Sequence, residues 1–298
     1  MSIIRGYSIY DGLPKELEIS NGRIKRITTK RRMESDTYSD QYIAPGLIDN
    51  QINGYLGVDF TGPGLTVDKV REVTRALWKV GVTTYFPTLI TSSYENLLEN
   101  FSILAAAVRD SEIGQSIPGF HLEGPYISPE DGYRGAHPRE WVRAPDWKEF
   151  EQLYAAGDRK ISQVTLAPEQ PGSLDFIRVA RSSGIVIALG HHNASPQIIR
   201  DAVEAGAAIS THLGNGCANM IHRHDNPLWT QLAEDRLMAS IIVDGIHLRP
   251  EEVQTFYKVK GTDGILLTSD VTHLAGLQPG SYSINGRDVV LTSDGMIK

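Results

Sequence analysis

The sequence has almost no cysteine and no long hydrophobic run. With one cysteine, Cys217, in 298 residues, the chain cannot form an internal disulfide or a cysteine-based zinc site. Any metal must therefore be held by histidines and carboxylates. No segment approaches the roughly 20 apolar residues of a membrane span, and the N-terminus lacks the apolar stretch of a signal peptide. These absences predict a cytoplasmic protein with no membrane partner.

Positive charge is also scarce. The 29 Lys and Arg residues are outnumbered by 36 Asp and Glu, which gives a formal net charge of −7. Nucleic-acid binders cluster Lys and Arg against phosphates, but the one short basic cluster here, residues 30–32, lies in a polar stretch. We interpret that cluster as a solvated loop and predict no nucleic-acid partner. The length and the 41% hydrophobic content suit one large core, or a barrel with a small companion.

The N-terminal part has the pattern of a small β unit. Two short strands are predicted at residues 17–20 and 23–28, on either side of Asn21-Gly22, which is a type I′ hairpin signal. A polar stretch, residues 29–41, follows. We therefore predict a small β domain at residues 1–43 and a second domain at residues 44–298.

The second part alternates short apolar runs with amphipathic segments such as residues 67–80 and 196–205. The apolar runs are residues 46–52, 83–86, 119–122, 163–166, 185–189, 208–212, 240–243 and 265–268. Strands that alternate with helices indicate a parallel sheet, and eight repeats favour a closed TIM (β/α)8 barrel. The alternative is an open doubly wound sheet, but no G-x-G-x-x-G loop follows the first run.

Polar residues that could take part in catalysis or metal binding lie at or just after the ends of the apolar runs. They are Gln51, Asn53, Glu123, His191, His192, His212, Asp244, His247 and Asp270. In a TIM barrel the active site lies at the C-terminal ends of the strands, so these side chains are expected to share one opening.

Three of these residues predict a metal site. Taken alone, Glu123 is a surface turn residue more often than a ligand, and His191 and His212 are core or rim residues more often than ligands. Together, at the ends of the third, fifth and sixth runs, they form an open His₂Glu set. That set suits a hydrolytic metal site with a position left for water.

Other polar residues near the runs have competing interpretations. His121 shares a strand face with Glu123, and we interpret it as a packed residue. His192 is as able to orient the site as to bind a ligand. Asp270 ends the eighth run in L-L-T-S-D, where a carboxylate can act as general base and then general acid, or cap a helix.

These segments closely resemble the N-acetylglucosamine-6-phosphate deacetylases of the amidohydrolase superfamily. The matching stretches, in family order, are A-P-G-L-I-D-N-Q-I-N-G-Y-L-G-V-D-F, H-L-E-G-P-Y-I-S-P-E, G-A-H-P, G-H-H-N-A-S, T-H-L-G-N, I-V-D-G-I-H-L and L-T-S-D. The resemblance implies metal-dependent release of acetate from N-acetylglucosamine 6-phosphate, with Glu123, His191 and His212 as ligands and Asp270 as the catalytic acid/base. It also implies one divalent ion, with zinc the first candidate and iron, manganese or cobalt as alternatives. The single ion is expected because Gln51 and Asn53 replace the H-x-H pair found in most of the superfamily.

The resemblance further implies a set of substrate contacts: Ala136, His137, Asn215, Gly216, Arg223 and His247. His137 is expected to contact the substrate and help polarise the amide carbonyl. The family takes a phosphate-binding Arg from a neighbouring subunit, and Arg223 in His222-Arg223-His224 is the natural candidate, or else part of a polar surface loop. An Arg shared across subunits implies a homodimer.

Two departures from the family pattern keep alternatives open. Family members continue well beyond the 28 residues that follow Asp270 here, so we expect the barrel to lack its final helix and the β domain to lack its C-terminal strands. The chain is then a fragment, which we favour, or a short form completed by an oligomer partner. The unusual stretch after His212 keeps N-acetylgalactosamine 6-phosphate and other amide substrates open. A catalytically silent sugar-phosphate-binding protein is the alternative from another class.

Overall fold

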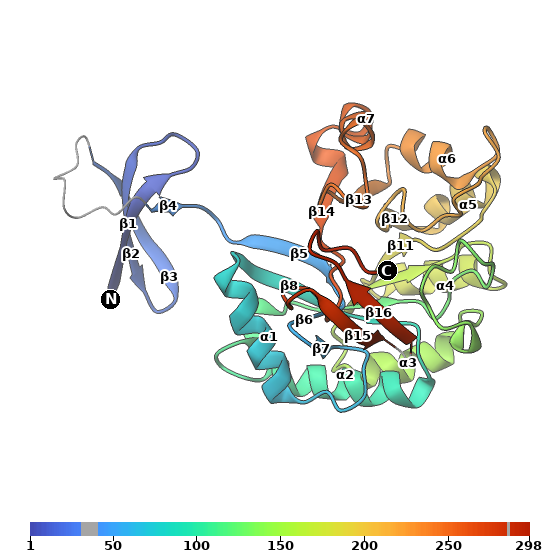
Figure 1. Ribbon diagram of the computed structural model, residues 1–298, viewed down its shortest axis with the longest axis horizontal. Coiled ribbons are helices and arrows are strands. Elements are labelled where there is room, and N and C mark those ends of the chain that lie inside the picture. The colour runs from blue at the N-terminus through green and yellow to red at the C-terminus, as the bar shows by residue number, and fades with distance from the viewer. Residues whose placement is uncertain (31–40, 285–286) are drawn as a thin grey trace. The chain divides into compact units, whose positions relative to one another are not determined.

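The computed structural model describes residues 1–30, 41–284 and 287–298. The chain divides into two compact units, Met1–Leu47 and Ile48–Lys298 (Figure 1). Most of the predicted polar stretch at residues 29–41, including Arg31 and Arg32 of the basic cluster, lies outside the described residues, as does a further hairpin signal at Asn285-Gly286.

The N-terminal unit is a four-stranded sheet in the order β3-β2-β1-β4. Its strands are β1 (Ser2–Ser8), β2 (Pro14–Ser20), β3 (Arg23–Thr29) and β4 (Tyr42–Ile43). The hairpin predicted at Asn21-Gly22 is confirmed: β2 and β3 pair antiparallel around it. Asn21 and Gly22 have φ values of 53° and 69°, and a type I′ turn needs positive φ at both central residues.

The second unit contains the eight-stranded sheet that the apolar runs predict. Its strands are β5 (Leu47–Ile52), β8 (Val82–Ile90), β9 (Phe120–Glu123), β10 (Ile161–Leu166), β11 (Val186–Leu189), β12 (Ala207–Ser210), β13 (Met238–Ile242) and β14 (Ile265–Thr268). They lie side by side in chain order, as they must in a barrel rather than a doubly wound sheet. The TIM-barrel prediction is therefore confirmed.

The first and last strands meet at their C-terminal ends, so the barrel is nearly closed. Ile52 forms a parallel bridge with Val271, and the backbone N–H of Asn53 donates to the carbonyl of Val271 at 2.9 Å. Deeper in the barrel, the hydroxyl of Thr268 donates to Asp49 Oδ1 at 2.8 Å. This closure brings the residues after β5 and β14 together.

Seven α-helices connect these strands in the described part of the chain. They are α1 (Val67–Lys79), α2 (Tyr94–Val108), α3 (Trp147–Ala156), α4 (Ser173–Ser182), α5 (Pro196–Ala205), α6 (Pro227–Ala233) and α7 (Pro250–Lys260). The helices predicted at residues 67–80 and 196–205 are confirmed as α1 and α5. In α5, Ser195 caps the first turn by accepting from the N–H of Ile198, and Pro196 occupies a first-turn position where no N–H is needed.

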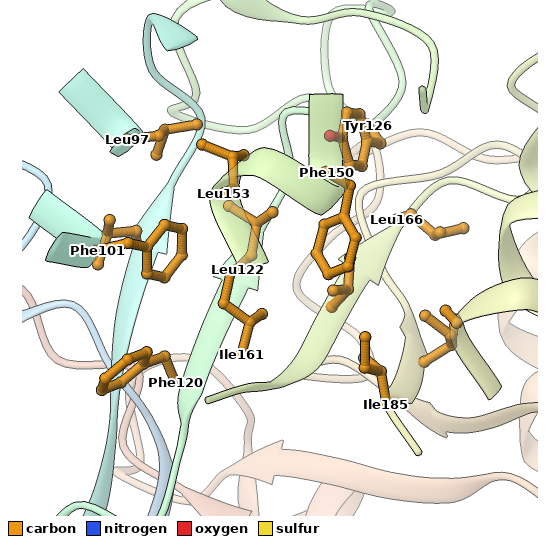
Figure 2. Packing of buried hydrophobic residues seen from close by; sticks show 14 of the residues in the cluster. Leu97, Phe101, Phe120, Leu122, Tyr126, Phe150, Leu153, Ile161, Leu166 and Ile185 are labelled. Atoms are coloured by element: carbon orange, nitrogen blue, oxygen red, sulfur yellow. The ribbon is translucent and has the colours of Figure 1, made fainter. Parts of the chain in front are cut away.

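The core lies between the sheet and its covering helices. Figure 2 shows Phe101 of α2, Phe150 of α3 and Phe120 of β9 among aliphatic side chains from the same helices and the neighbouring strands. The rings of Phe101 and Phe120 have centroids 6.1 Å apart, and all three phenylalanines are fully buried. Burying one such side chain stabilises the fold by about 1.5–3 kcal/mol. This core fixes strands β8, β9 and β10, which carry much of the site described below.

The part after β14 differs from the rest of the barrel. Within the described residues no α-helix follows β14, and Leu267 on that strand is 60% exposed. Strands β13 and β14 and helix α7 line an apolar cavity of about 460 Å³. The chain then forms an antiparallel hairpin of β15 (Gly280–Ile284) and β16 (Arg287–Leu291). The remaining short elements are β6 (Gly54–Tyr55), β7 (Val58–Asp59) and the 3₁₀ turns Gly114–Ser116, Arg139–Trp141 and Thr262–Gly264.

Of the helices in the described residues, none has both the length and the apolar character needed to cross a membrane.

Candidate active site

Glu123, His191 and His212 converge at the C-terminal ends of their strands. Oε1 of Glu123 lies 2.9 Å from Nε2 of His212 and 3.2 Å from Nε2 of His191, and the two Nε2 atoms are 3.1 Å apart. All three residues are buried, and their potential ligand atoms lie within 4.8 Å of one another. Three chain segments thus place three ligand-type atoms around one point.

The backbone at this end of the barrel has unusual conformations. His191, His212 and Asp270 each lie two residues beyond the last residue of their strands, β11, β12 and β14. Their φ values are 52°, 29° and 52°, in the left-handed region that residues with a Cβ seldom adopt. Each such residue costs about 1–2 kcal/mol, so the surrounding structure must over-determine the conformation. The repeated turn directs each side chain back over the barrel opening.

Close backbone approaches hold the histidines in place. The carbonyl oxygen of Tyr133 lies 2.9 Å from Nδ1 of His191 and accepts its N–H, which leaves Nε2 free to bind a ligand. A Cβ on Gly216 would lie 3.0 Å from the backbone nitrogen of His191 and 3.1 Å from Cε1 of His212. A Cβ on Gly135 would lie 3.0 Å from Cε1 of His191. Two glycines therefore let neighbouring loops pack directly against the histidine rings.

The cluster fits a metal ion. Ligand atoms bound about 2.0 Å from a tetrahedral ion lie roughly 3.3 Å apart, which is close to the three spacings here. Burial alone raises the pKa of Glu123, but its hydrogen bonds with His191 and His212 outweigh burial and hold the pKa well below its usual range. An ionised carboxylate and two imidazole nitrogens form a donor set suited to divalent zinc, iron, manganese or cobalt.

Asp270 lies next to this cluster and is held by two side-chain amides. Its Oδ1 accepts hydrogen bonds from Asn53 Nδ2 at 2.7 Å and from Gln51 Nε2 at 2.9 Å. Burial, and then the charge of Glu123, raise the pKa of Asp270 to about 6. No helix begins at Asp270 in the described residues, so the helix-cap alternative is wrong. The site has a half-buried carboxylate that can exchange a proton near neutral pH.

His137 is a predicted substrate residue whose ring lies beside the cluster. It is 5% exposed, its Nε2 lies 4.0 Å from Glu123 Oε2, and its ring packs edge-on against His191 with centroids 4.4 Å apart. On the other side of the ring, Nδ1 lies 2.7 Å from the hydroxyl of Thr91. Burial, as the largest effect, lowers the pKa of His137 to about 3, so the ring is neutral.

The other predicted substrate residues fall into two groups. Gly216 contacts the cluster as described, and Asn215 has a buried Nδ2 with no hydrogen-bond partner among the described residues. Ala136, next to His137, is exposed.

Arg223 and His247 are not brought to the cluster. Arg223 is exposed, and its carbonyl oxygen accepts the indole N–H of Trp229 at 2.9 Å. The side chain of His247 is 48% exposed, and its Nδ1 pairs with Oδ2 of Asp244 at 2.7 Å. In the described part of the chain neither side chain has a hydrogen bond or ion pair with the cluster. Their role in binding the substrate stays a prediction.

The two remaining histidines of the pattern are buried but lie outside the cluster. His121 is fully buried, as expected, and its Nε2 lies 2.7 Å from the hydroxyl of Thr165 in the barrel interior. His192 is 3% exposed, and its Nδ1 accepts the backbone N–H of Ala194 at 3.2 Å. Neither has a ligand atom in the cluster.

Sequence reasoning missed Thr91 and Tyr133. Thr91 directly follows β8, but the predicted apolar run ends at residue 86, whereas the strand continues to Ile90. The true strand end would have placed Thr91 among the polar residues at the barrel opening. Tyr133 contributes only its backbone carbonyl, for which the sequence gives no signal.

The barrel and the cluster at its strand ends define an amidohydrolase. No protein-family model matches the chain. The N-acetylglucosamine-6-phosphate deacetylase of Bacillus subtilis is 31% identical over 293 residues, which cover 94% of this chain and 73% of that protein. The enzyme of the same name from Bos taurus is 33% identical over 305 residues, covering 96% of this chain and 72% of that one.

The comparison with solved structures points to the same enzyme. The crystal structure of N-acetyl-D-glucosamine-6-phosphate deacetylase from Mycobacterium smegmatis superposes with a TM-score of 0.86 at 29% identity, covering 100% of this chain and 78% of that chain. The chain therefore belongs to the N-acetylglucosamine-6-phosphate deacetylase family. It spans about three quarters of the length of these relatives.

Proposed function

We propose that this chain hydrolyses the acetyl amide of N-acetylglucosamine 6-phosphate to give glucosamine 6-phosphate and acetate. The observation that carries the proposal is the position of Asp270, a half-buried carboxylate held by Gln51 and Asn53 beside the cluster of Glu123, His191 and His212. The relatives that bear this enzyme name support the substrate class.

An amide resists hydrolysis because its carbonyl is a poor electrophile and its amine is a poor leaving group. Glu123, His191 and His212 would hold one divalent ion, with zinc the first candidate. When bound, such an ion acts as a Lewis acid and makes water a better nucleophile. Gln51 and Asn53 stand where most amidohydrolases have two more histidine ligands, and their amides already bind Asp270, which supports one ion rather than two.

Asp270 would move the proton that the reaction requires. It accepts a proton from the attacking water as the carbon–oxygen bond forms, and it delivers that proton to the amine nitrogen as the carbon–nitrogen bond breaks. A pKa raised to about 6 suits both steps near neutral pH, since the group is ionised before attack and readily protonated after it. His137 would donate a hydrogen bond to the acetyl oxygen, on which negative charge develops.

The rest of the substrate would be held by loops at the barrel opening. The unpartnered, buried Nδ2 of Asn215 suits a sugar or phosphate oxygen. Arg223 would bind the phosphate, with His247 as a further contact. If the family pattern holds, Arg223 acts on a neighbouring subunit, and the active form is a homodimer. A charged sugar phosphate does not cross a bilayer unaided, which supports a cytoplasmic location. Catalysis is assigned to residues 44–298, because the cluster and Asp270 lie within that range.

The central test is acetate release. The chain is stripped with a chelator, reloaded with zinc, and supplied with N-acetylglucosamine 6-phosphate or its galactosamine isomer. Acetate from the glucosamine compound supports the proposal, provided that chelation abolishes the release and Asp270→Asn abolishes it with bound metal retained. Release of acetate only from the galactosamine isomer would show that N-acetylgalactosamine 6-phosphate is the substrate instead. Substrate binding with no release from either compound would favour a silent sugar-phosphate-binding protein.

The phosphate assignment has a separate test. Arg223→Ala should raise KM strongly for the phosphorylated sugar and little for unphosphorylated N-acetylglucosamine, because only the former loses a charged partner. Arg178→Ala is the matched control, because Arg178 is an exposed arginine on the surface of α4, paired there with Asp175. Equal changes of KM for both sugars in Arg223→Ala would contradict the assignment.

A further inference from the structure

The imidazole of His137 has a different environment at each of its two nitrogens. Nδ1 faces Thr91, at 2.7 Å from its hydroxyl oxygen and 3.4 Å from its backbone nitrogen. Nε2 faces the cluster, 4.0 Å from Glu123 Oε2. The ring therefore bridges the end of β8 and the centre of the site.

The Thr91 side decides which nitrogen of the neutral ring carries the proton. A backbone N–H can only donate, so the N–H of Thr91 directed at Nδ1 requires a lone pair there. The hydroxyl can donate to the same lone pair, whereas a proton on Nδ1 would face the amide proton directly. Both groups of Thr91 thus favour a ring whose proton lies on Nε2.

The position of the Thr91 hydroxyl is itself closely restricted. Thr91 is 1% exposed, and a Cβ on Gly124, directly after Glu123, would lie 2.2 Å from its Oγ1. The absence of a side chain at Gly124 therefore makes the room in which the hydroxyl lies. Gly124 has φ of 76°, which also favours glycine. The turn after the ligand Glu123 and the hydroxyl that contacts His137 form one packed unit.

We propose that Thr91 is a positioning residue that fixes His137 in the tautomer with its proton on Nε2, directed at the acyl oxygen of the substrate. The proposal rests on the proposed amide hydrolysis and adds a residue outside the predicted site. A neutral donor held in advance at the oxygen stabilises the charge that develops there, without reorganising during the reaction. Thr91 touches neither substrate nor metal ligand atoms in this account and acts only through His137.

Two substitutions separate the hydroxyl from the volume of the side chain. Thr91→Val keeps the size but removes the hydroxyl at 2.7 Å and leaves only the weaker backbone N–H contact at 3.4 Å, so the ring can turn or shift its proton to Nδ1 more easily. We expect kcat to fall at least about tenfold with a small change of KM, since removal of one oxyanion donor costs roughly 10²–10³ in kcat. Thr91→Ser keeps the hydroxyl and should retain most of the turnover. Thr74→Val is the control: Thr74 is a fully buried threonine on α1, bonded to Tyr85 and Val70, and its loss should lower stability but not kcat.

A spectroscopic readout tests the tautomer without turnover. Long-range ¹H–¹⁵N spectra of the zinc-loaded, ¹⁵N-histidine-labelled chain, with His137 assigned by difference from His137→Gln, should show Nε2 protonated and Nδ1 unprotonated. Thr91→Val should weaken or reverse that pattern, and Thr91→Ser should keep it.

The outcomes distinguish this inference from the proposed function. An inactive wild type would reject the proposed function, while the spectra would still report the tautomer. An active wild type with unchanged kcat in Thr91→Val would overturn the inference alone. Lost turnover with the Nε2 proton retained would also overturn it, because Thr91 would then act by some means other than the tautomer.

Discussion

Asn53 donates a 2.7 Å hydrogen bond from its side-chain amide to Oδ1 of Asp270, across the seam where β5 meets β14. Gln51 donates to the same oxygen at 2.9 Å. Two neutral donors on one oxygen fix the carboxylate plane and leave Oδ2 for proton transfer. Oε1 of Gln51 and Oδ1 of Asn53 are buried without partners among the described residues. The site therefore has two free hydrogen-bond acceptors beside the proposed base.

Asn53→Asp should weaken the proposed base by charge. A second carboxylate at hydrogen-bond distance raises the pKa of Asp270 further above its value of about 6, because two like charges cannot both ionise easily. Less of the base is then ionised at pH 7, so kcat falls and the acid limb of its pH profile moves to higher pH. The profile between pH 5 and 9 measures the shift. Asn53→Ala, which removes the hydrogen bond without adding charge, should move the limb less; an unmoved limb in Asn53→Asp would contradict the role of Asp270.

Glu123→Gln should remove most of the bound metal. The substitution keeps the shape of the side chain but removes the negative charge that two imidazoles and a divalent ion require. Metal content per chain after dialysis against a weak chelator measures the loss. His192→Gln is the matched control, because His192 is adjacent to the proposed ligand His191 but bonds Ala194 instead of the cluster. Full metal retention in Glu123→Gln would show that the ion binds elsewhere.

The fold could be predicted from the sequence because its signal is local and repeated. Each barrel strand appears as an apolar run, since strands β9 to β13 are largely buried on both faces, and the helices between the strands are amphipathic. Glu123, His191, His212 and Asp270 were identified for the same reason, since they lie at or just after the ends of those runs and the barrel topology brings strand ends together.

The other features of the site depend on distances between loops that cannot be read from the sequence pattern. The predicted run ended at residue 86 and so missed Thr91, although β8 continues through Pro87 to Ile90. The contact of the Tyr133 carbonyl and the space left by the missing side chain of Gly124 are backbone features. They arise from the packing of two loops, which the sequence pattern does not indicate. Arg223 and His247 lie on exposed loops, where side-chain direction follows from local turns instead of a sheet.

Gly135→Ala should displace His191. Gly135 has φ of 61°, and an added Cβ would lie 3.0 Å from Cε1 of the His191 ring. Gly64→Ala provides the matched control, since Gly64 has φ of 70° with nothing within 4 Å of the added Cβ. Both variants should lose about 1 kcal/mol of stability or more through backbone strain, but only Gly135→Ala should also weaken metal binding. Thermal unfolding and metal titration measure the two effects, and equal metal affinity in the two variants would contradict the contact.

The barrel interior beneath the site contains a buried neutral histidine. His121 is fully buried between Thr88 and Thr165, with side-chain hydrogen bonds of 3.3 Å and 2.7 Å. Burial, as the dominant effect, lowers its pKa to about 4 from the ordinary value of 6.5. Between these two pH values, His121 is therefore neutral in the folded chain and protonated in the unfolded chain.

This difference predicts that His121 makes the fold sensitive to acid. Because the folded-state pKa lies below the unfolded one, the unfolded chain binds more protons between pH 6.5 and about 4, and stability falls as the pH falls through that range. The contribution is on the order of 3 kcal/mol when complete, at about 1.4 kcal/mol per unit of pKa shift. Urea unfolding of the metal-free chain at pH 7, 6 and 5 should show a shallower loss of stability in His121→Gln than in the wild type. The buried rings of His137 and His192, whose pKa values are also lowered, keep part of the slope in both proteins, so an identical slope in the two would mean that His121 is not the proton acceptor on unfolding.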